Sequence, residues 1–318
     1  MFKRIFLLAT TLLVVSAAIA VLAQDPIRQV NDPVLINLIN NSPKVFWKAT
    51  HYPQFENMSV EDFRKRLGAV LIQPGTADMI MERLQKQSST NKVVAAPASF
   101  DSRVKWPKCI HPIRNQEQCG SCWAFSASEV LSDRLCIATD GKTDLVLSPQ
   151  YMVSCDTRNY GCDGGYLNLA WNFLVTTGIP SDACVPYTSG DGKSNGKCPT
   201  KCSNGQAVTL YKAKSAKHVI GVSNAENELY EYGPIQTGFT VYRDFMSYKS
   251  GVYHHVSGEA LGGHAVKIVG YGVDSVSNKK YWIVANSWGT SWGMNGFFWI
   301  LKGVDECNIE SGMWTGYA

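Results

Sequence analysis

The spacing of apolar residues divides the chain after residue 96 into a helical half and a strand-rich half. From Cys122 to about Cys136, apolar residues recur every three and four positions, as on one buried face of a helix; they are Ala124, Ala127, Val130, Leu131 and Leu135. A second helix is predicted to start at Ser148-Pro149, because proline suits the first helical position. A third is predicted from Tyr166 to Thr177, ending at Gly178.

Strand-like runs dominate the second half, after a short helix that ends at Gly233-Pro234. The runs are β-branched or aromatic and bounded by glycines, which predicts strands at Ile235–Val241, Gly251–Val256, Ala265–Val269, Tyr281–Ala285 and Phe297–Leu301. Helices followed by strands indicate an α+β fold with two packed lobes rather than an alternating α/β sheet. We expect the lobes at residues 96–206 and 207–318.

The first 23 residues have the layout of a secretory signal peptide. Lys3 and Arg4 precede an uncharged apolar run, Ile5–Ala23, with cleavage expected at Ala18-Ile19-Ala20 or at Val21-Leu22-Ala23. A membrane anchor is the alternative, since about 18 apolar residues can span a bilayer, but no basic flank follows the run. We therefore expect entry into the secretory pathway and no stable membrane span after cleavage.

Residues 24–95 form a polar segment of mixed charge that contains no cysteine. One helix is predicted from Ser59 to Leu71, with Ser59 and Asp62 as a variant of the capping box. Two glycosylation sequons, Asn40-Asn41-Ser42 and Asn57-Met58-Ser59, fit passage through a secretory pathway.

The composition is that of a globular protein whose cysteines are confined to one part of the chain. Apolar residues make up 45% and charged residues 18%, and the net charge of +4 is spread along the sequence, so no surface for nucleic acid or an anionic membrane is indicated. All ten cysteines lie from Cys109 onward. Clustered cysteines in a secreted protein typically form disulfides, although an even count identifies no free thiol.

The densest chemical motif is the run Gln-Glu-Gln-Cys-Gly-Ser-Cys-Trp-Ala-Phe from Gln116 to Phe125. Ser121 can cap a helix that starts at Cys122, where unpaired N–H groups and the helix dipole favour a negative charge. With an imidazolium nearby, such a position can lower the pKa of a thiol from about 8.5 to as little as about 3.5. The motif therefore favours a cysteine nucleophile.

Of the six histidines, His264 has the most suitable surroundings for a catalytic partner. It follows Gly262-Gly263, which lets backbone and substrate approach the ring. Asn286 lies on the turn after a predicted strand, where its neutral amide could orient the ring, with Trp288 shielding the bond from water. The other histidines are less suitable. His51 lies in the N-terminal segment and His111 shortly before the nucleophile, and no special residues flank His218, His254 or His255.

In these motifs and their order, the chain from about Pro97 to Gly316 resembles the cathepsin B group of the papain-like cysteine proteases. Besides the Cys122 and His264 motifs, the likeness includes Ser99-Phe100-Asp101, Cys162-Asp163-Gly164-Gly165-Tyr166, Gly251-Val252-Tyr253 and Asn286-Ser287-Trp288-Gly289. The resemblance implies a papain-like fold in which a cleft separates a helical lobe from an antiparallel, β-barrel-like lobe. It also implies a cysteine endopeptidase that works through an acyl-enzyme.

The resemblance assigns roles residue by residue. Cys122 is implied as nucleophile, His264 as general base and acid, Asn286 as the residue that orients it, and Gln116 as oxyanion donor with the backbone N–H of Cys122. Gly165 is implied to pair with an extended peptide. The residues expected to contact substrate are Gly164, Gly165, Tyr166, Ala265, Trp288 and Gly312. No cofactor and no metal are expected.

The resemblance also implies how the cysteines pair. The expected disulfides are Cys109–Cys136, Cys119–Cys162, Cys155–Cys198 and Cys184–Cys202. Cys122 and Cys307 remain, and Cys307 is expected to be a buried inert thiol.

Two departures from the family change the expected specificity. The segment between Cys184 and Cys198 is short and free of histidine, whereas cathepsin B carries a His-His occluding loop, so we expect an endopeptidase with little dipeptidyl-carboxypeptidase activity. Gly312 stands where the family places an acid. A hydrophobic residue rather than Arg is therefore expected at the second position before the scissile bond, in a pocket lined by Tyr166, Ala265 and Gly312.

Residues 24–95 resemble a cathepsin B propeptide around Trp47-Lys48-Ala49 and His51. Such a segment would block the cleft until acid protonates interface carboxylates and processing occurs near Val94–Pro97. The expected partners are protein and peptide substrates, this propeptide and cystatin-like inhibitors. The expected destination is a lysosome-like or vacuolar compartment or the outside of the cell.

Other classes of protein fit the sequence less well. An inactive homologue that acts as a secreted binding module is the main alternative, although all four residues implied in catalysis are present. A zinc enzyme is disfavoured because His-Glu-x-x-His is missing, and a serine hydrolase because Gly-x-Ser-x-Gly is missing.

Overall fold

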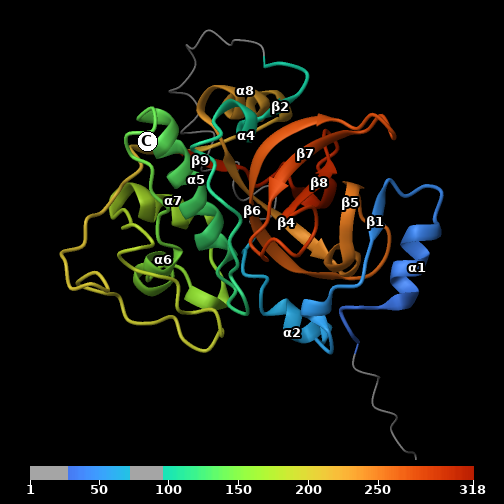
Figure 1. Ribbon diagram of the computed structural model, residues 1–318, viewed down its shortest axis with the longest axis horizontal. Coiled ribbons are helices and arrows are strands. Elements are labelled where there is room, and N and C mark those ends of the chain that lie inside the picture. The colour runs from blue at the N-terminus through green and yellow to red at the C-terminus, as the bar shows by residue number, and fades with distance from the viewer. Residues whose placement is uncertain (1–27, 72–95) are drawn as a thin grey trace, which may run out of the picture.

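Helices and strands segregate into two lobes, and an N-terminal segment lies across both (Figure 1). The computed structural model describes residues 28–71 and 96–318. The expected signal peptide and the first half of the expected processing region, Val94–Pro97, lie outside the described residues. Within them, no helix combines the length and the apolar character needed to cross a membrane.

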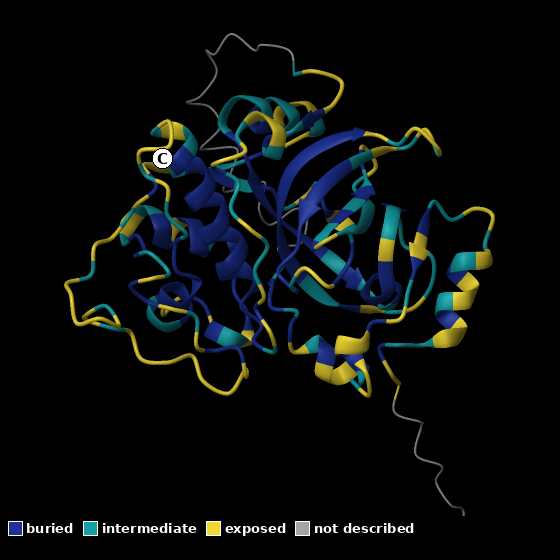
Figure 2. Cartoon of the chain, viewed as in Figure 1, coloured by how far each residue is buried: buried dark blue, intermediate teal, exposed yellow. Residues whose placement is uncertain are grey.

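The helical lobe contains the three helices that the sequence predicts, namely α5 (Cys122–Ala138), α6 (Pro149–Cys155) and α7 (Leu167–Thr176). The α5 helix is buried on nearly all sides rather than on one face (Figure 2). Leu135, from the expected face, is only half-buried, whereas Asp133 and Arg134 are buried. Because α5 lies between the two lobes, its polar residues find partners in the opposite lobe.

The sheet lobe is antiparallel except for one parallel pair, β5 with β8. Its strands, which pair in the order β5-β8-β7-β6-β4-β9-β3, are β3 (Ser215–His218), β4 (Ile235–Tyr242), β5 (Tyr248–Tyr253), β6 (Ala260–Val273), β7 (Lys280–Ala285), β8 (Phe297–Leu301) and β9 (Trp314–Tyr317). The β6 strand is longer than predicted, and His254-His255 lie after β5 rather than within it. The helix α8 (Val222–Tyr232) ends before Gly233, as expected.

The chain crosses between the lobes near its start. The strand β2 (Phe100–Asp101) pairs with β6, and helix α4 (Ser102–Lys105) follows it. Short 3-10 turns connect other elements: η1 (Pro53–Phe55), η2 (Gly161–Asp163), η3 (Arg243–Ser247) and η4 (Glu306–Asn308). Residues near position 100 thus belong structurally to the sheet lobe.

The N-terminal segment, residues 28–71, docks mainly on the sheet lobe and then enters the space between the lobes (Figure 1). Its helix α1 (Pro33–Asn41) was not predicted, although Asp32 caps it by accepting from the N–H groups of Val34 at 2.9 Å and Leu35 at 3.3 Å. The strand β1 (Trp47–Ala49) extends the sheet beside β5, and Trp47 is 2% exposed. The segment therefore shares a hydrophobic core with the sheet lobe.

The predicted helix from Ser59 to Leu71 is wrong in its length, because α2 covers only Val60–Arg64. Ser59 does cap it, accepting from the N–H of Asp62 at 3.0 Å. Beyond the helix the chain becomes extended and passes so close to the helical lobe that a Cβ on Gly68 would lie 1.7 Å from the carbonyl oxygen of Gly120. Tertiary contacts with both lobes, rather than local preference, determine this stretch.

Four disulfides hold the helical lobe together. They join Cys109 to Cys136, Cys119 to Cys162, Cys155 to Cys198 and Cys184 to Cys202, the pairs that the resemblance implies. Cys122 and Cys307 are free, and Cys307 is half-buried rather than fully buried.

Candidate active site

Cys122 is the first residue of α5 and is fully buried beneath the N-terminal segment. Its Sγ accepts a hydrogen bond from the backbone N–H of Gly68 at 3.3 Å. Ser121 occupies the N-cap position but does not cap the helix through its side chain. Its hydroxyl instead bonds to that of Tyr187 at 2.9 Å, and the backbone N–H groups of Trp123 and Cys122 act to lower the pKa of the sulfur.

His264 lies on β6 and faces the cleft with its orientation fixed from one side. Its Nε2 is 2.7 Å from Oδ1 of Asn286, the residue that follows β7. The ring stacks on Trp288 at a centroid distance of 4.7 Å, which covers that hydrogen bond. Its Nδ1 has no hydrogen-bond partner among the described residues. The imidazole is thus held by Asn286, and its other nitrogen is available to a reacting group.

Gln116 is held at the reacting centre by a residue that sequence reasoning missed. The hydroxyl of Ser287 donates to Oε1 of Gln116 at 2.7 Å, and the N–H of Gln116 donates to the carbonyl of Ser287 at 2.9 Å. Nε2 of Gln116 consequently points at the carbonyl oxygen of Arg66, at 2.9 Å. The position of Ser287 directly after Asn286 was the available signal.

The N-terminal segment passes through the site as an extended chain. The carbonyl of Gly68 accepts from the N–H of Gly165 at 2.8 Å, and the N–H of Val70 donates back to Gly165 at 3.0 Å. On the opposite wall, the N–H of Ala69 donates to the carbonyl of Gly263 at 3.0 Å. These bonds make a parallel bridge between Ala69 and Gly165, so both lobes bind one strand of the chain.

Burial keeps the sulfur and the imidazole neutral in this state. Desolvation raises the pKa of Cys122 to about 11, against the opposing effect of backbone hydrogen bonds from Ala265 and Gly68. Desolvation also lowers the pKa of His264 to about 4, although the bond to Asn286 acts in the other direction. Burial beneath the segment therefore disfavours the thiolate–imidazolium pair that the sequence motif favours.

The expected pocket residues lie near the segment's last described residue, Leu71. Ala265 forms an apolar cluster with Cys122 and Leu167, against which Leu71 packs. Leu71 also fills the space beside Gly238, where an added Cβ would lie 2.7 Å from it. The nearest atoms to a Cβ added at Gly312 would be backbone atoms of Gly238, 3.6 Å away, which is an ordinary contact distance. Gly312 therefore leaves this pocket open. Leu167 and Gly238 were not predicted to take part.

Gly164 and Tyr166, which were also expected to contact substrate, have different surroundings from the pocket residues. Gly164 lies against the carbonyl of Gly68, where a Cβ would be 2.7 Å from its oxygen. Tyr166 is half-buried at the start of α7, its N–H bonded to Asn159 at 2.8 Å and its ring 6.4 Å from that of Tyr160. Within residues 28–71 and 96–318, no group of three or more His, Cys, Asp or Glu side chains is arranged to hold a metal ion.

Comparisons with known proteins agree on one family. The model of the papain family cysteine proteases matches residues 96–317. The cathepsin B-like CP3 of Giardia intestinalis is 42% identical over 273 residues, which cover 85% of this chain and 89% of that protein. The cathepsin B-like cysteine proteinase 4 of Caenorhabditis elegans is 38% identical, with 85% and 88% covered. Among solved structures, procathepsin B S9 of Trypanosoma congolense has a TM-score of 0.78 and 34% identity, covering 91% of this chain and 98% of its own.

Proposed function

The chain belongs to the papain family of cysteine proteases, and on that premise we propose that it is the precursor of a cathepsin B-like endopeptidase. Residues 28–71 then belong to an inhibitory propeptide, and the peptidase starts near residue 96. The observation that carries the proposal is the placement of three groups: Sγ of Cys122 accepts from the N–H of Gly68, the His264 imidazole is held by Asn286, and the Gln116 amide donates to the carbonyl of Arg66, two residues before Gly68.

In the mature enzyme, the Cys122 thiolate attacks the carbonyl carbon of the scissile bond. Nε2 of Gln116 and the backbone N–H of Cys122 donate to the oxyanion that forms. His264 gives its proton to the departing amine, which leaves a thioester on Cys122. It then takes a proton from the water that hydrolyses the thioester, so the acid and the thiol are released. Asn286 keeps the ring in place without competing for the proton, because its amide is neutral.

The propeptide blocks this chemistry by its direction as well as by its bulk. The carbonyl of Arg66 accepts the hydrogen bond that the Gln116 amide would give to a substrate oxyanion. Ala69, three residues later, forms a parallel β-bridge with Gly165. The family resemblance places the residues before a scissile bond on the Gly165 side. The propeptide therefore runs opposite to a substrate, and its peptide bonds do not present a leaving amine to His264. Inhibition without cleavage follows from this geometry.

We propose that the specificity pocket takes the hydrophobic residue two positions before the scissile bond. Leu71 supports this assignment, because a leucine side chain already packs against Leu167 and Ala265 there. Gly312 adds no charge to the pocket. Replacing Gly312 with Glu should introduce a preference for Arg at that position in a peptide library, and an unchanged profile would refute the assignment of Gly312.

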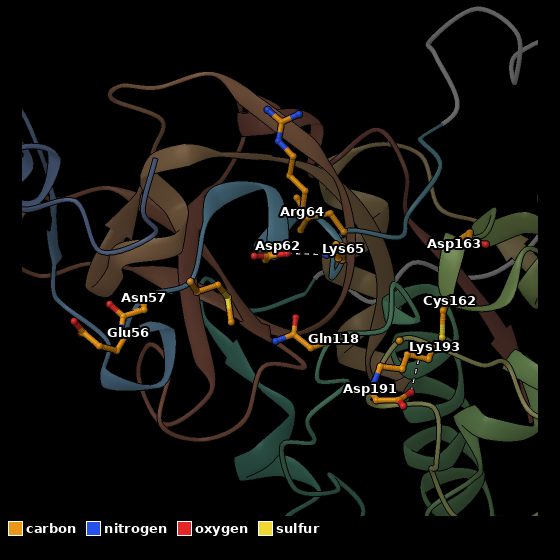
Figure 3. Close-up of a pocket in the computed structure, with 13 residues that line it drawn as sticks. Glu56, Asn57, Asp62, Arg64, Lys65, Gln118, Cys162, Asp163, Asp191 and Lys193 are labelled. Carbon is orange, nitrogen blue, oxygen red and sulfur yellow. Dashed lines mark hydrogen bonds and ion pairs between the residues drawn. The ribbon is translucent and has the colours of Figure 1, made fainter. Parts of the chain in front are cut away.

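The groove beyond the reacting centre supports endopeptidase activity. An opening of about 840 Å³ lies between the propeptide and the helical lobe, bounded by Asp191, Gly192 and Lys193 of the short segment that replaces an occluding loop (Figure 3). Removal of the propeptide would open this side further, so a substrate chain can continue past the scissile bond. Stepwise release of C-terminal dipeptides by the purified enzyme would contradict the proposal.

Acid release of the propeptide has two supports in the described residues. Arg28 pairs with Glu259 across the interface, and Asp32 is 2.7 Å from Arg243. Desolvation acts to raise the pKa of Glu259, but its own backbone N–H and the charge of Arg28 lower it below its ordinary value. These pairs are partly exposed and weak. Protonation of Glu259 as the pH falls removes its pair with Arg28 and so favours the uncovered site.

The test is a pH–rate profile on peptide substrates, before and after Cys122 is blocked with an alkylating agent. An active peptidase should lose all turnover on labelling, and Cys122→Ala should be inactive. A secreted binding module of the same fold would show no turnover and no labelling of Cys122 at acidic pH. Passage through the secretory pathway, a lysosome-like or extracellular destination and cystatin-like inhibitors remain part of this proposal.

A further inference from the structure

We propose that Glu117 and Gln118 select basic residues on the C-terminal side of the scissile bond. The inference rests on the proposed peptidase function and adds a determinant of substrate choice to it. Glu117 and Gln118 lie between the oxyanion donor Gln116 and the disulfide-bonded Cys119, on the helical-lobe wall of the cleft.

A basic side chain already occupies this wall. Nε of Arg66 donates to Oε1 of Gln118 at 3.4 Å, while the carbonyl of Arg66 accepts from Gln116. The guanidinium also packs over Phe55 at 5.2 Å and Phe63 at 5.7 Å from the ring centroids, and Arg66 is 7% exposed. Burial lowers the pKa of Arg66 to about 10, and the charge of Glu117 acts against that shift. The propeptide thus shows which kind of side chain fits here.

Glu117 is fixed in place despite an unfavourable backbone conformation. Its φ is +56°, in the left-handed region that non-glycine residues rarely adopt. Its N–H donates to Oδ1 of Asn115 at 3.0 Å. Its carboxylate packs over Gly190, where an added Cβ would lie 2.4 Å from Oε2. The N–H of Gln118 bonds to the carbonyl of Gly190 at 2.7 Å, so the short loop holds both residues.

The surrounding wall has an excess of negative charge. Figure 3 shows Gln118 at the opening, which is also lined on the helical-lobe side by Asp163, Asp191 and Lys193. Glu117, which precedes Gln118 in the chain, does not line the opening itself but adds a third carboxylate to the same wall, where Lys193 supplies one ammonium group. Across the opening, Arg64 and Lys65 are paired with Glu61 and Asp62 of their own helix. Arg66 is therefore the propeptide cation that contacts the wall.

The position of Arg66 identifies the substrate residues concerned. Gln116 and Cys122 mark the reacting centre, and Gly165 lies on the side that binds residues before the scissile bond. Arg66 approaches from the other side, next to Phe63 and Trp288, whose rings are 5.0 Å apart. When the propeptide leaves, the residues that follow the scissile bond take this place. A Lys or Arg that follows the scissile bond can contact the side chain of Gln118 and is attracted by the negative charge of Glu117.

The test uses the mature enzyme and quenched peptides that differ only at the first two positions after the scissile bond. Three peptides carry Lys-Arg, Gln-Gln or Glu-Glu, and mass spectrometry verifies the cleavage point. We expect kcat/KM for the Lys-Arg peptide to exceed that for the Gln-Gln peptide by about two- to fivefold at low salt, the range of an exposed ion pair. The ratio should fall toward one at high salt, because ions screen exposed charges.

Variants then assign the effect to this wall. Glu117→Gln should bring the ratio close to one, and Glu117→Lys should make the Glu-Glu peptide the better substrate of the charged pair. Asp140→Asn is the matched control, because Asp140 is also an exposed acid with a left-handed φ of +52° but lies just beyond the far end of α5. It should leave the ratio unchanged.

The outcomes separate this inference from the proposed function. Equal kcat/KM for all three peptides in the unsubstituted enzyme at low salt would overturn the inference and leave the peptidase intact. The same conclusion would follow if Asp140→Asn lowered the ratio as much as Glu117→Gln does. If the Glu117 variants fail to fold, the salt dependence of the kcat/KM ratio in the unsubstituted enzyme still tests the inference. Absence of any cleavage, with Cys122 unreactive toward alkylation, would instead refute the peptidase.

Discussion

Replacing Phe63 with Ala should open the precursor without altering the mature enzyme. Phe63 is fully buried on α2, and its ring meets Phe55 at 5.2 Å and Trp288 at 5.0 Å, both nearly at right angles. Trp288 in turn stacks on His264. Phe63 therefore connects the propeptide to the wall that carries the catalytic ring, and it is removed with the propeptide.

The expected size of the effect follows from this burial. Truncating a buried Phe to Ala costs about 3–5 kcal/mol, through lost transfer energy and the cavity left behind. Since 1.4 kcal/mol is tenfold in an equilibrium constant, the fraction of precursor with an uncovered site should rise by about a hundred- to several-thousandfold. The assay is the rate of alkylation of Cys122 in the intact precursor at neutral pH. Mass spectrometry of the Cys122 peptide separates this signal from Cys307.

Val34→Ala is the matched control, because Val34 lies on α1 of the same propeptide and is 74% exposed. It should change the labelling rate less than about twofold. When reclosure is fast, labelling reports the open population, so the rates compare directly. A Phe63→Ala precursor that is labelled as slowly as the unsubstituted one would refute the view that aromatic packing on Trp288 holds the site closed.

Three further predictions concern protonation, the core and the close approach of the propeptide. Below about pH 4.5, the open fraction of the precursor should rise as Glu259 is protonated and loses its ion pair with Arg28; a labelling rate of Cys122 that stays constant down to about pH 4 would contradict this. Lys267→Met removes the ammonium 2.7 Å from buried Asp133 and leaves His111 as its remaining cationic partner, so it should destabilise the mature enzyme by about 3 kcal/mol at neutral pH, with partial recovery in acid, measured by thermal unfolding. Gly68→Ala should uncover the thiol in the precursor, because its Cβ would meet Gly120 at 1.7 Å, while the mature activity stays unchanged.

The sequence was most informative where chemistry requires particular residue types at particular places. A thiol at a helix start, a histidine after two glycines and an asparagine after a strand could be identified one by one, and the structure brings Cys122, His264, Asn286 and Gln116 to one place. The three helices of the helical lobe were also predicted, because each has a clear start or stop signal. Local signals were sufficient for these features.

Features that depend on contacts between distant segments could not be predicted. The end of α2 at Arg64 is determined by the narrow passage between Gly120 and Gly165, not by its own residues. The all-round burial of α5 was missed because periodicity describes one face, and the buried Asp133 is compensated by Lys267 from β6 and by His111. A lysine within the apolar run of β6 was the available signal. The neutral state of Cys122 was missed because it depends on the propeptide above it.

The placement of the four disulfides has a consequence for how this protein tolerates reducing conditions. All four lie in the lobe that carries Cys122, which must itself stay reduced. Cys119, three residues away, is inaccessible, whereas Cys198 is exposed on the surface loop. Cys162, the partner of Cys119, is half-buried, so the more exposed Cys155–Cys198 bond is the first of the two that a mild reductant reaches. The loop beside the cleft gains mobility first, and the nucleophile keeps its support.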